Sequence, residues 1–266
     1  MASLGGVSAA RPTRAAARLH TRLVRAGLLP GHRTYTPFVI VSQARSGSNL
    51  LVSLLGSHPS IAARGELLKR LAGAGIETRL AEIYGPEPRR IQAAGFKCFY
   101  YHPLDDRGTD VWAGLLAVPR LHVIHLTRRN GLRTVTSRRL ADLTGSWLEA
   151  GGAPGPAGPS STPAGKPTVR FTPGELTEAF EQCDRWETEC RRRFDGHPLH
   201  EVAYEDLARD PEVAQEVMRF LGVAPRAPRT RLHRQNPEPL SQLIEGFDDL
   251  QARFADTPWS GYFTDR

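Results

Sequence analysis

The sequence has no long hydrophobic run: no stretch approaches the roughly 18 uninterrupted apolar residues expected of a helix that crosses a membrane. We therefore predict no membrane-spanning segment, which argues against an enzyme anchored in the Golgi membrane by its N-terminus. The 266 residues, of which 40% are hydrophobic, suffice for one large α/β domain but are few for two independent ones.

Cysteine is also scarce, and the three cysteines, Cys98, Cys183 and Cys190, form no C-x-x-C pair. An odd number of cysteines in a chain of this size fits a reducing compartment better than a set of disulfides, so we expect a cytoplasmic protein. Cys183 and Cys190 would share one face of a predicted helix. We interpret them as small buried hydrophobic residues rather than as metal ligands or redox groups.

Lysine is nearly absent, so arginine carries almost all of the net charge of +7. Such a surplus suits an anionic nucleotide, a nucleic acid or a membrane surface as partner. The arginines are scattered and are not interleaved with aromatic residues, which disfavours a nucleic acid. Residues 1–35 contain several arginines and no acidic residue. This segment fits either a mitochondrial transit peptide or a short helix packed on the domain, and we favour the helix because the whole chain is rich in alanine and arginine.

One stretch has the pattern of a strand, a loop and a helix. Residues 38–41 are apolar and largely β-branched, a small polar turn centred on Gly47 follows, and leucines then recur at helical spacing. A loop between a buried strand and a helix N-terminus directs backbone N–H groups at one point, where the helix dipole favours negative charge. We predict a phosphate-binding loop there, although an ordinary turn with a permissive glycine is the alternative. Its side-chain donors would be Arg45, Ser46, Ser48 and Asn49.

A second candidate loop follows the predicted strand at residues 121–126. Arg129 lies just beyond this strand, and Ser137 comes eight residues later. Ligands of open α/β sheets bind outside the carboxyl ends of the strands, and cations at a helix N-terminus are unfavourable unless an anion is near. We therefore predict that Arg129 and Ser137 reach one phosphate.

Two further strands are predicted at residues 95–100 and 199–204, and helical stretches separate the strands, which indicates a parallel sheet with helices on both faces. Thr172 and Glu175 form a capping-box pattern that begins a helix. Residues 150–168 are rich in glycine, proline and serine and cannot bury a core. We interpret them as a flexible insertion within one domain, either a lid or a surface loop.

Three stretches in this order resemble the sulfotransferases that use 3′-phosphoadenosine 5′-phosphosulfate as donor. The sequence R-S-G-S-N at residues 45–49 is similar to their 5′-phosphosulfate loop, and Arg129 with Ser137 to their 3′-phosphate motif. Residues 202–222, with V-A-Y-E-D-L and F-L-G, are similar to their later strand and helix. The resemblance implies a P-loop-NTPase-like, three-layer α/β domain over residues 36–266, with a parallel sheet of four or five strands.

The chain is most similar to the bacterial carbohydrate sulfotransferases, a group that includes trehalose 2-sulfotransferase and the nodulation-factor sulfotransferases. This closer match rests on S-H-P at residues 57–59, G-E-L-L at 65–68, G-F-K at 95–97 and R-Q-N-P at 234–237. The glutamate after the first helix is the proposed general base in the trehalose enzyme's family, and Glu66 matches that position. Asn49 departs from the Ser or Thr that is usual in the loop.

The resemblance implies that the donor's sulfonate group is transferred to a hydroxyl without a metal. Arg45 and the four residues after it would hold the 5′-phosphate, Arg129 and Ser137 would hold the 3′-phosphate, and Arg234 is a weaker candidate for a further donor contact. The relatives favour a hydroxyl of a carbohydrate, glycolipid or glycosylated natural product as acceptor.

Glu66 would accept the proton of that hydroxyl, and a salt bridge to Arg64 or Arg45 is its alternative role. For Lys97 we keep two interpretations, a contact with the sulfonate or a strand lysine that extends to solvent. Two other functions stay open for the chain: a nucleotide-dependent kinase with a degenerate loop and a nucleotide-binding protein without turnover. The kinase is disfavoured because the Walker A lysine and an evident Mg²⁺-binding aspartate are missing.

Overall fold

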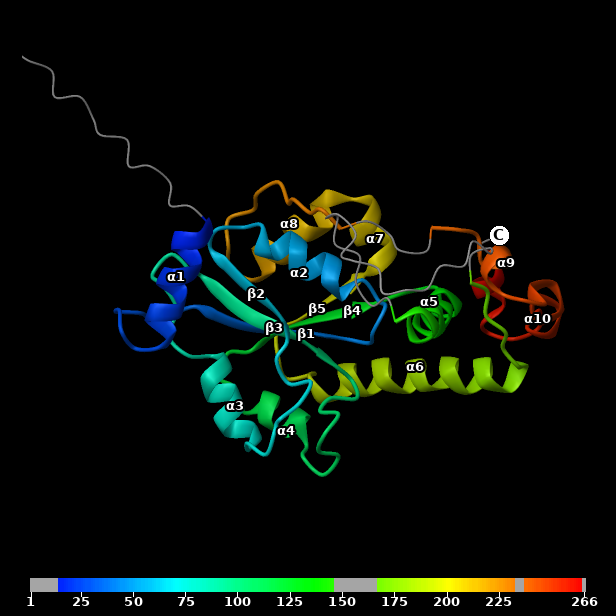
Figure 1. Cartoon of the computed structure of the whole chain (residues 1–266), viewed down its shortest axis with the longest axis horizontal. Helices are drawn as coiled ribbons and strands as arrows, with labels where there is room; N and C mark the ends of the chain where they lie inside the picture. Colours follow the sequence, from blue (N-terminus) through cyan, green and yellow to red (C-terminus); the bar gives the residue numbers. More distant parts are fainter. Residues whose placement is uncertain (1–13, 146–166, 233–236, 265–266) are drawn as a thin grey trace, which may run out of the picture.

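The computed structural model describes residues 14–145, 167–232 and 237–264 (Figure 1). Three of the sequence predictions concern residues outside these ranges, wholly or in part. Most of the insertion at residues 150–168, the beginning of the segment 1–35 and the candidate donor ligand Arg234 lie outside the described part of the chain.

Five parallel strands form one sheet in the order β2-β3-β1-β4-β5. The strands are β1 (Thr36–Ser42), β2 (Ile61–Glu66), β3 (Ala93–Phe99), β4 (His122–Thr127) and β5 (Leu199–Ala203). The predicted parallel sheet of four or five strands is confirmed. β1 is the central strand of the sheet, with β3 on one side and β4 on the other, and helices cover both of its faces. This burial explains its almost unbroken apolar sequence.

Helices cover both faces of the sheet, as Figure 1 shows, so the predicted three-layer α/β fold is also confirmed. One face carries α2 (Ser48–Gly56), α7 (Tyr204–Arg209) and α8 (Pro211–Phe220). The other face carries α3 (Ile76–Ile83), α4 (Val111–Leu116) and α6 (Pro173–Arg193). The remaining helices are α1 (Arg14–Arg25), α5 (Gly131–Thr144), α9 (Leu240–Leu243), α10 (Phe247–Arg253) and the 3₁₀ helix η1 (Ser260–Phe263).

A third apolar cluster joins α5 and α6 to the C-terminal elements. Leu132 of α5 and Phe180 of α6 are fully buried in it together with Phe263 of η1. The capping box at the start of α6 is confirmed, because Thr172 and Glu175 exchange hydrogen bonds between side chain and backbone. The C-terminal tail therefore fixes α5, the helix that follows the second candidate loop.

All three cysteines are buried, as predicted, and each is a free thiol in the structure. Burial raises the pKa of the Cys98 thiol to about 12 and that of Cys183 to about 11, so neither is a thiolate near neutral pH. In the described part of the chain, His, Cys, Asp and Glu side chains form no group of three or more that could hold a metal ion. None of the described helices is long and apolar enough to cross a membrane.

Candidate active site

A cavity of about 1450 Å³ opens at the carboxyl ends of the strands. Each of the five strands contributes to its wall through its last residues or the residues that follow. The lining includes Arg45, Gly47, Ser48 and Asn49 after β1, Glu66 of β2, Lys97, Tyr101 and His102 from β3 onward, Arg128, Arg133 and Ser137 after β4, and Tyr204 after β5.

The loop after β1 forms the floor of this cavity. Gly47 is the N-cap of α2 and has a φ of 89°, and Arg45 also adopts a positive φ, of 69°. Ser48 begins the helix and faces the cavity, so the loop and the helix N-terminus meet there, as expected for an anion site. Ser46 is different: its buried hydroxyl donates to the carbonyl oxygen of Gln43 at 2.8 Å and does not line the cavity. Its side chain therefore stabilises the loop.

If this loop holds the phosphate that the sequence predicts, replacing Gly47 by alanine should weaken nucleotide binding by at least about tenfold. A Cβ atom at this position would lie 2.3 Å from Cδ2 of Tyr204, and the positive φ is strained for any residue with a side chain. Calorimetric titration with adenosine 3′,5′-bisphosphate measures the loss. Gly73→Ala is the matched control, because Gly73 has a φ of 78° but no atom within 4 Å of an added Cβ. Equal binding by both variants would contradict the role of the Gly47 contact.

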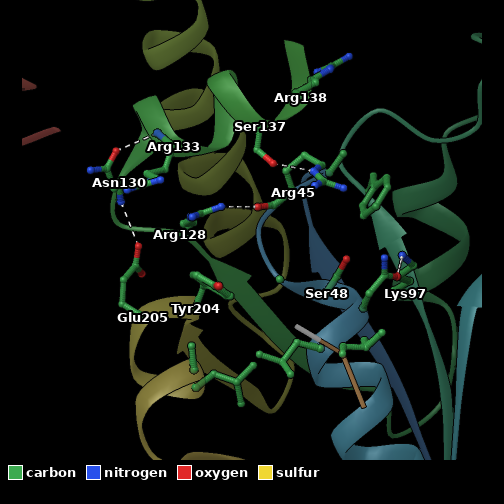
Figure 2. Close-up of a pocket in the computed structure, with 18 of the residues that line it drawn as sticks. Arg45, Ser48, Lys97, Arg128, Asn130, Arg133, Ser137, Arg138, Tyr204 and Glu205 are labelled. Carbon is green, nitrogen blue, oxygen red and sulfur yellow. Dashed lines mark hydrogen bonds between the residues drawn. The ribbon is translucent and has the colours of Figure 1, made fainter. Parts of the chain in front are cut away.

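The two predicted phosphate motifs meet in the cavity (Figure 2). The Arg45 Nε donates to the Ser137 hydroxyl at 2.9 Å, and Arg128 donates to the Arg45 carbonyl oxygen at 3.0 Å. The guanidinium of Arg128 also lies 4.6 Å from the ring centroid of Tyr204. Arg128 thus bridges the loop after β1, the loop after β4 and the start of α7.

Arg129 does not line the cavity, although its motif predicts a phosphate contact. Its guanidinium forms a bidentate pair with Asp206 of α7, and its side chain is 60% exposed. Glu205 accepts hydrogen bonds from the backbone N–H groups of Arg129 and Asn130 at 3.1 and 3.3 Å. A carboxylate of the protein therefore occupies the N-terminus of α5, and Arg129 lies at the rim of the cavity beside it.

Glu66 lies on the opposite wall, at the end of β2, in contact with cationic groups. Lys97 Nζ is 3.1 Å from Oε1 of Glu66, and Lys69 Nζ is 4.0 Å from Oε2. Lys97 also donates to Oδ1 of Asn49 at 2.5 Å, which links the candidate base to the phosphate loop. Arg64, the partner considered from the sequence, pairs instead with the buried Glu87. Burial lowers the pKa of Lys97, and Glu66 acts in the opposite direction.

His102 is the side chain of this wall that sequence reasoning missed. Its Nδ1 accepts a hydrogen bond from the Phe99 backbone N–H at 3.2 Å, so the neutral ring carries its proton on Nε2. That Nε2 is buried and lies 3.6 Å from Oε2 of Glu66. Glu66 is therefore flanked by Lys97 on one oxygen and by the N–H of His102 on the other.

His102 is expected to make the protein less stable in mild acid. Burial is the main cause that lowers its pKa from 6.5 to about 4. As the pH falls between these values, the unfolded chain binds a proton that the folded chain does not bind, so this contribution to stability is lost, on the order of 1–3 kcal/mol. Urea unfolding of the wild type and of His102→Gln at pH 7.5 and 5 measures the effect. An equal loss of stability in both proteins would contradict it.

Comparisons with known proteins agree with the resemblance that the sequence motifs indicate. No family model matches the sequence. Two sequences of nodulation protein H from Rhizobium meliloti, one of them from strain 1021, are each 29% identical to this chain over 244 residues, which cover 85% of the chain and 94% of the relative. This chain is similar in sequence to nodulation protein H over most of its length. The predicted resemblance to the sulfotransferases, and among them to the nodulation-factor group, is thereby confirmed.

Two further similarities accompany this match. Nodulation protein H from Rhizobium tropici is 28% identical to the chain over 246 residues, which cover 85% of the chain and 92% of that relative. The solved structure of the sulfotransferase domain from the Synechococcus PCC 7002 olefin synthase is similar with a TM-score of 0.40 and 18% identity, over 73% of this chain and 76% of that chain.

Proposed function

We propose that this protein, which is similar to nodulation protein H, transfers the sulfonate group of 3′-phosphoadenosine 5′-phosphosulfate to a hydroxyl group of a sugar. The observation that carries the proposal is the pairing, in one cavity, of a phosphate-type loop at Arg45–Ser48 with the carboxylate of Glu66. The motifs of the sequence support the sugar as acceptor.

The donor side of the cavity is strongly cationic and suits a nucleotide with two phosphate groups. The backbone N–H groups at the start of α2, with Arg45 and Ser48, would hold the 5′-phosphate. Ser137 would contact the 3′-phosphate from α5. Arg129 would contact the same 3′-phosphate, and to do so its guanidinium would leave Asp206 and bind the phosphate instead. That exchange costs little, because solvent screens an exposed ion pair and its net contribution to stability is small.

Glu66 would remove the proton of the acceptor hydroxyl. The hydroxyl oxygen attacks sulfur in line with the bond that breaks between sulfur and the phosphate oxygen, and the proton passes to a carboxylate oxygen of Glu66. Lys97, which reaches both Asn49 of the loop and Glu66, would neutralise negative charge between the two ends of the reaction. Arg45 would stabilise the charge that develops on the departing phosphate.

Arg129→Ala is expected to weaken binding of adenosine 3′,5′-bisphosphate by about 10- to 100-fold and to leave binding of adenosine 5′-phosphate unchanged. Asp206→Asn is expected to preserve or slightly strengthen binding, because it releases the guanidinium. Calorimetric titration measures both nucleotides. Arg219→Ala is the control, since Arg219 forms a comparable exposed pair with Glu212 away from the cavity. An unchanged preference for the bisphosphate in Arg129→Ala would exclude Arg129 as a ligand of the 3′-phosphate.

A further inference from the structure

A second cavity, of about 490 Å³, adjoins the main one. The two share four wall residues, Tyr101, His102, Leu104 and Arg138, so they lie side by side. Binding sites for single drug-sized ligands have volumes of about 300–1000 Å³. The main cavity exceeds this range, and the side cavity is an open hollow with room for a group the size of one or two sugar rings.

The side cavity lies next to the candidate base. His102 belongs to its wall, and the Nε2 of this residue is 3.6 Å from Oε2 of Glu66. The acceptor must present its hydroxyl to Glu66 while the nucleotide fills the cationic side between Arg45 and Ser137. The rest of the acceptor then needs room on the His102 side. The side cavity provides room on that side.

Two aromatic residues form one wall of the side cavity. The rings of Tyr101 and Trp186 are 5.6 Å apart between centroids. Trp186 also stacks on Tyr100, whose hydroxyl is 2.7 Å from Nε2 of the buried His125. Trp186 is half-buried and packs on the buried Tyr100 on that side. An aromatic surface of this kind packs well against the apolar face of a ring.

Charged groups of the side cavity favour an anion. Arg138 lies on α5 with its guanidinium 5.4 Å from the Tyr101 ring centroid, and Figure 2 shows it directed away from Arg128 and Arg133. Arg107, an exposed residue, is the second arginine of the lining. Asp106 is the acidic residue among the described lining residues, and its two oxygens accept three hydrogen bonds from its own turn, from Gly108 and Thr109. Two arginines and one carboxylate that is already hydrogen-bonded leave the lining with a net positive charge.

We propose that the side cavity is the acceptor subsite and that it takes a ring-bearing acceptor with an acidic substituent, held by Arg107 and Arg138 beside the Tyr101–Trp186 wall. Guanidinium groups bind carboxylate, phosphate and sulfate groups through paired, charge-assisted hydrogen bonds. This inference rests on the proposed function, because it takes Glu66 as the point that the acceptor hydroxyl must reach.

Matched neutral and acidic sugars test the inference on the full chain saturated with adenosine 3′,5′-bisphosphate. The probes are D-glucose with D-glucuronate, and N-acetylglucosamine with its 6-phosphate, and ligand-detected NMR titration gives their affinities. We expect at least one acidic sugar to bind about tenfold or more tightly than its neutral counterpart. Arg107→Gln and Arg138→Gln should remove that difference, and Arg253→Gln, an exposed change outside both cavities, should retain it.

Three results would overturn the inference: equal binding of the acidic and neutral sugars, a preference that survives in both variants, or no binding of any of the four probes. Binding of the bisphosphate is measured first in the same samples. A protein that does not bind the bisphosphate would contradict the proposed function as well, whereas bisphosphate binding without the acidic preference would contradict only the acceptor class.

Discussion

Glu66→Gln should lower kcat for sulfonate transfer by about 100- to 10,000-fold and leave the affinity for adenosine 3′,5′-bisphosphate within about twofold. Glutamine keeps the size of the side chain and can still contact Lys97 through its amide oxygen, but it cannot take up the proton of the acceptor hydroxyl. The hydroxyl of the proposed sugar acceptor is a weak nucleophile while it holds its proton. The chemical step therefore slows, whereas the affinity for the donor does not change. Transfer of radiolabelled sulfonate to an acceptor found by screening measures kcat, and calorimetry measures the affinity.

Two comparisons separate catalysis by Glu66 from a structural role. Glu178→Gln changes an exposed glutamate of α6 outside the cavity and should leave kcat unchanged. An unfolding midpoint of Glu66→Gln equal to that of the wild type shows that the fold is intact. Full transfer by Glu66→Gln would contradict its role as the base. An equal loss of turnover and of bisphosphate affinity would instead indicate that Glu66 maintains the phosphate loop through Lys97 and Asn49.

Gly95→Ala is expected to destabilise the protein by about 3 kcal/mol or more, so that little folded protein is recovered. Gly95 pairs with Phe38 across β3 and β1, and an added Cβ would lie 2.0 Å from the Phe38 carbonyl oxygen and 2.5 Å from its Cγ. Phe38 is fully buried at the centre of the sheet, so neither its backbone nor its ring can move aside. Because β1 leads into the candidate phosphate loop, distortion here should also remove the proposed nucleotide binding.

Urea unfolding followed by circular dichroism measures this loss of stability. Gly65→Ala is the matched control: Gly65 lies in β2, and an added Cβ there would meet no atom within 4 Å. The control should unfold within about 1 kcal/mol of the wild type. A Gly95→Ala protein with an unchanged unfolding midpoint would contradict the close approach of β1 and β3.

The central part of the fold could be predicted from the sequence because its signals are local. The sequence has, in direct succession, the apolar run of β1, the turn at Gly47 and the leucines of α2. Each of these patterns indicates by itself the element that the structure contains. β2 gave no comparable signal. It is an edge strand with the sequence I-A-A-R-G-E, its residues are mostly half-buried, and its pairing with β3 shifts between Arg64 and Glu66.

The candidate site could be predicted only in part, because side-chain direction depends on the tertiary structure. Arg45 and Ser137 were assigned from separate motifs, and the fold brings them into contact. Neighbouring residues at a strand end point in different directions, so Arg128 enters the cavity while Arg129 meets Asp206. His102 follows β3 without a motif of its own, and its role beside Glu66 depends on the Phe99 backbone N–H that orients its ring.

The most direct test of the donor assignment is calorimetric titration of the protein with adenosine 3′,5′-bisphosphate, adenosine 5′-phosphate and ATP under the same conditions. We predict tight binding of the bisphosphate alone, because the cavity offers contacts for a 5′-phosphate near Arg45 and for a 3′-phosphate near Ser137. Equal binding of the three nucleotides, or binding of none, would contradict the assignment of this protein as a sulfotransferase that uses 3′-phosphoadenosine 5′-phosphosulfate.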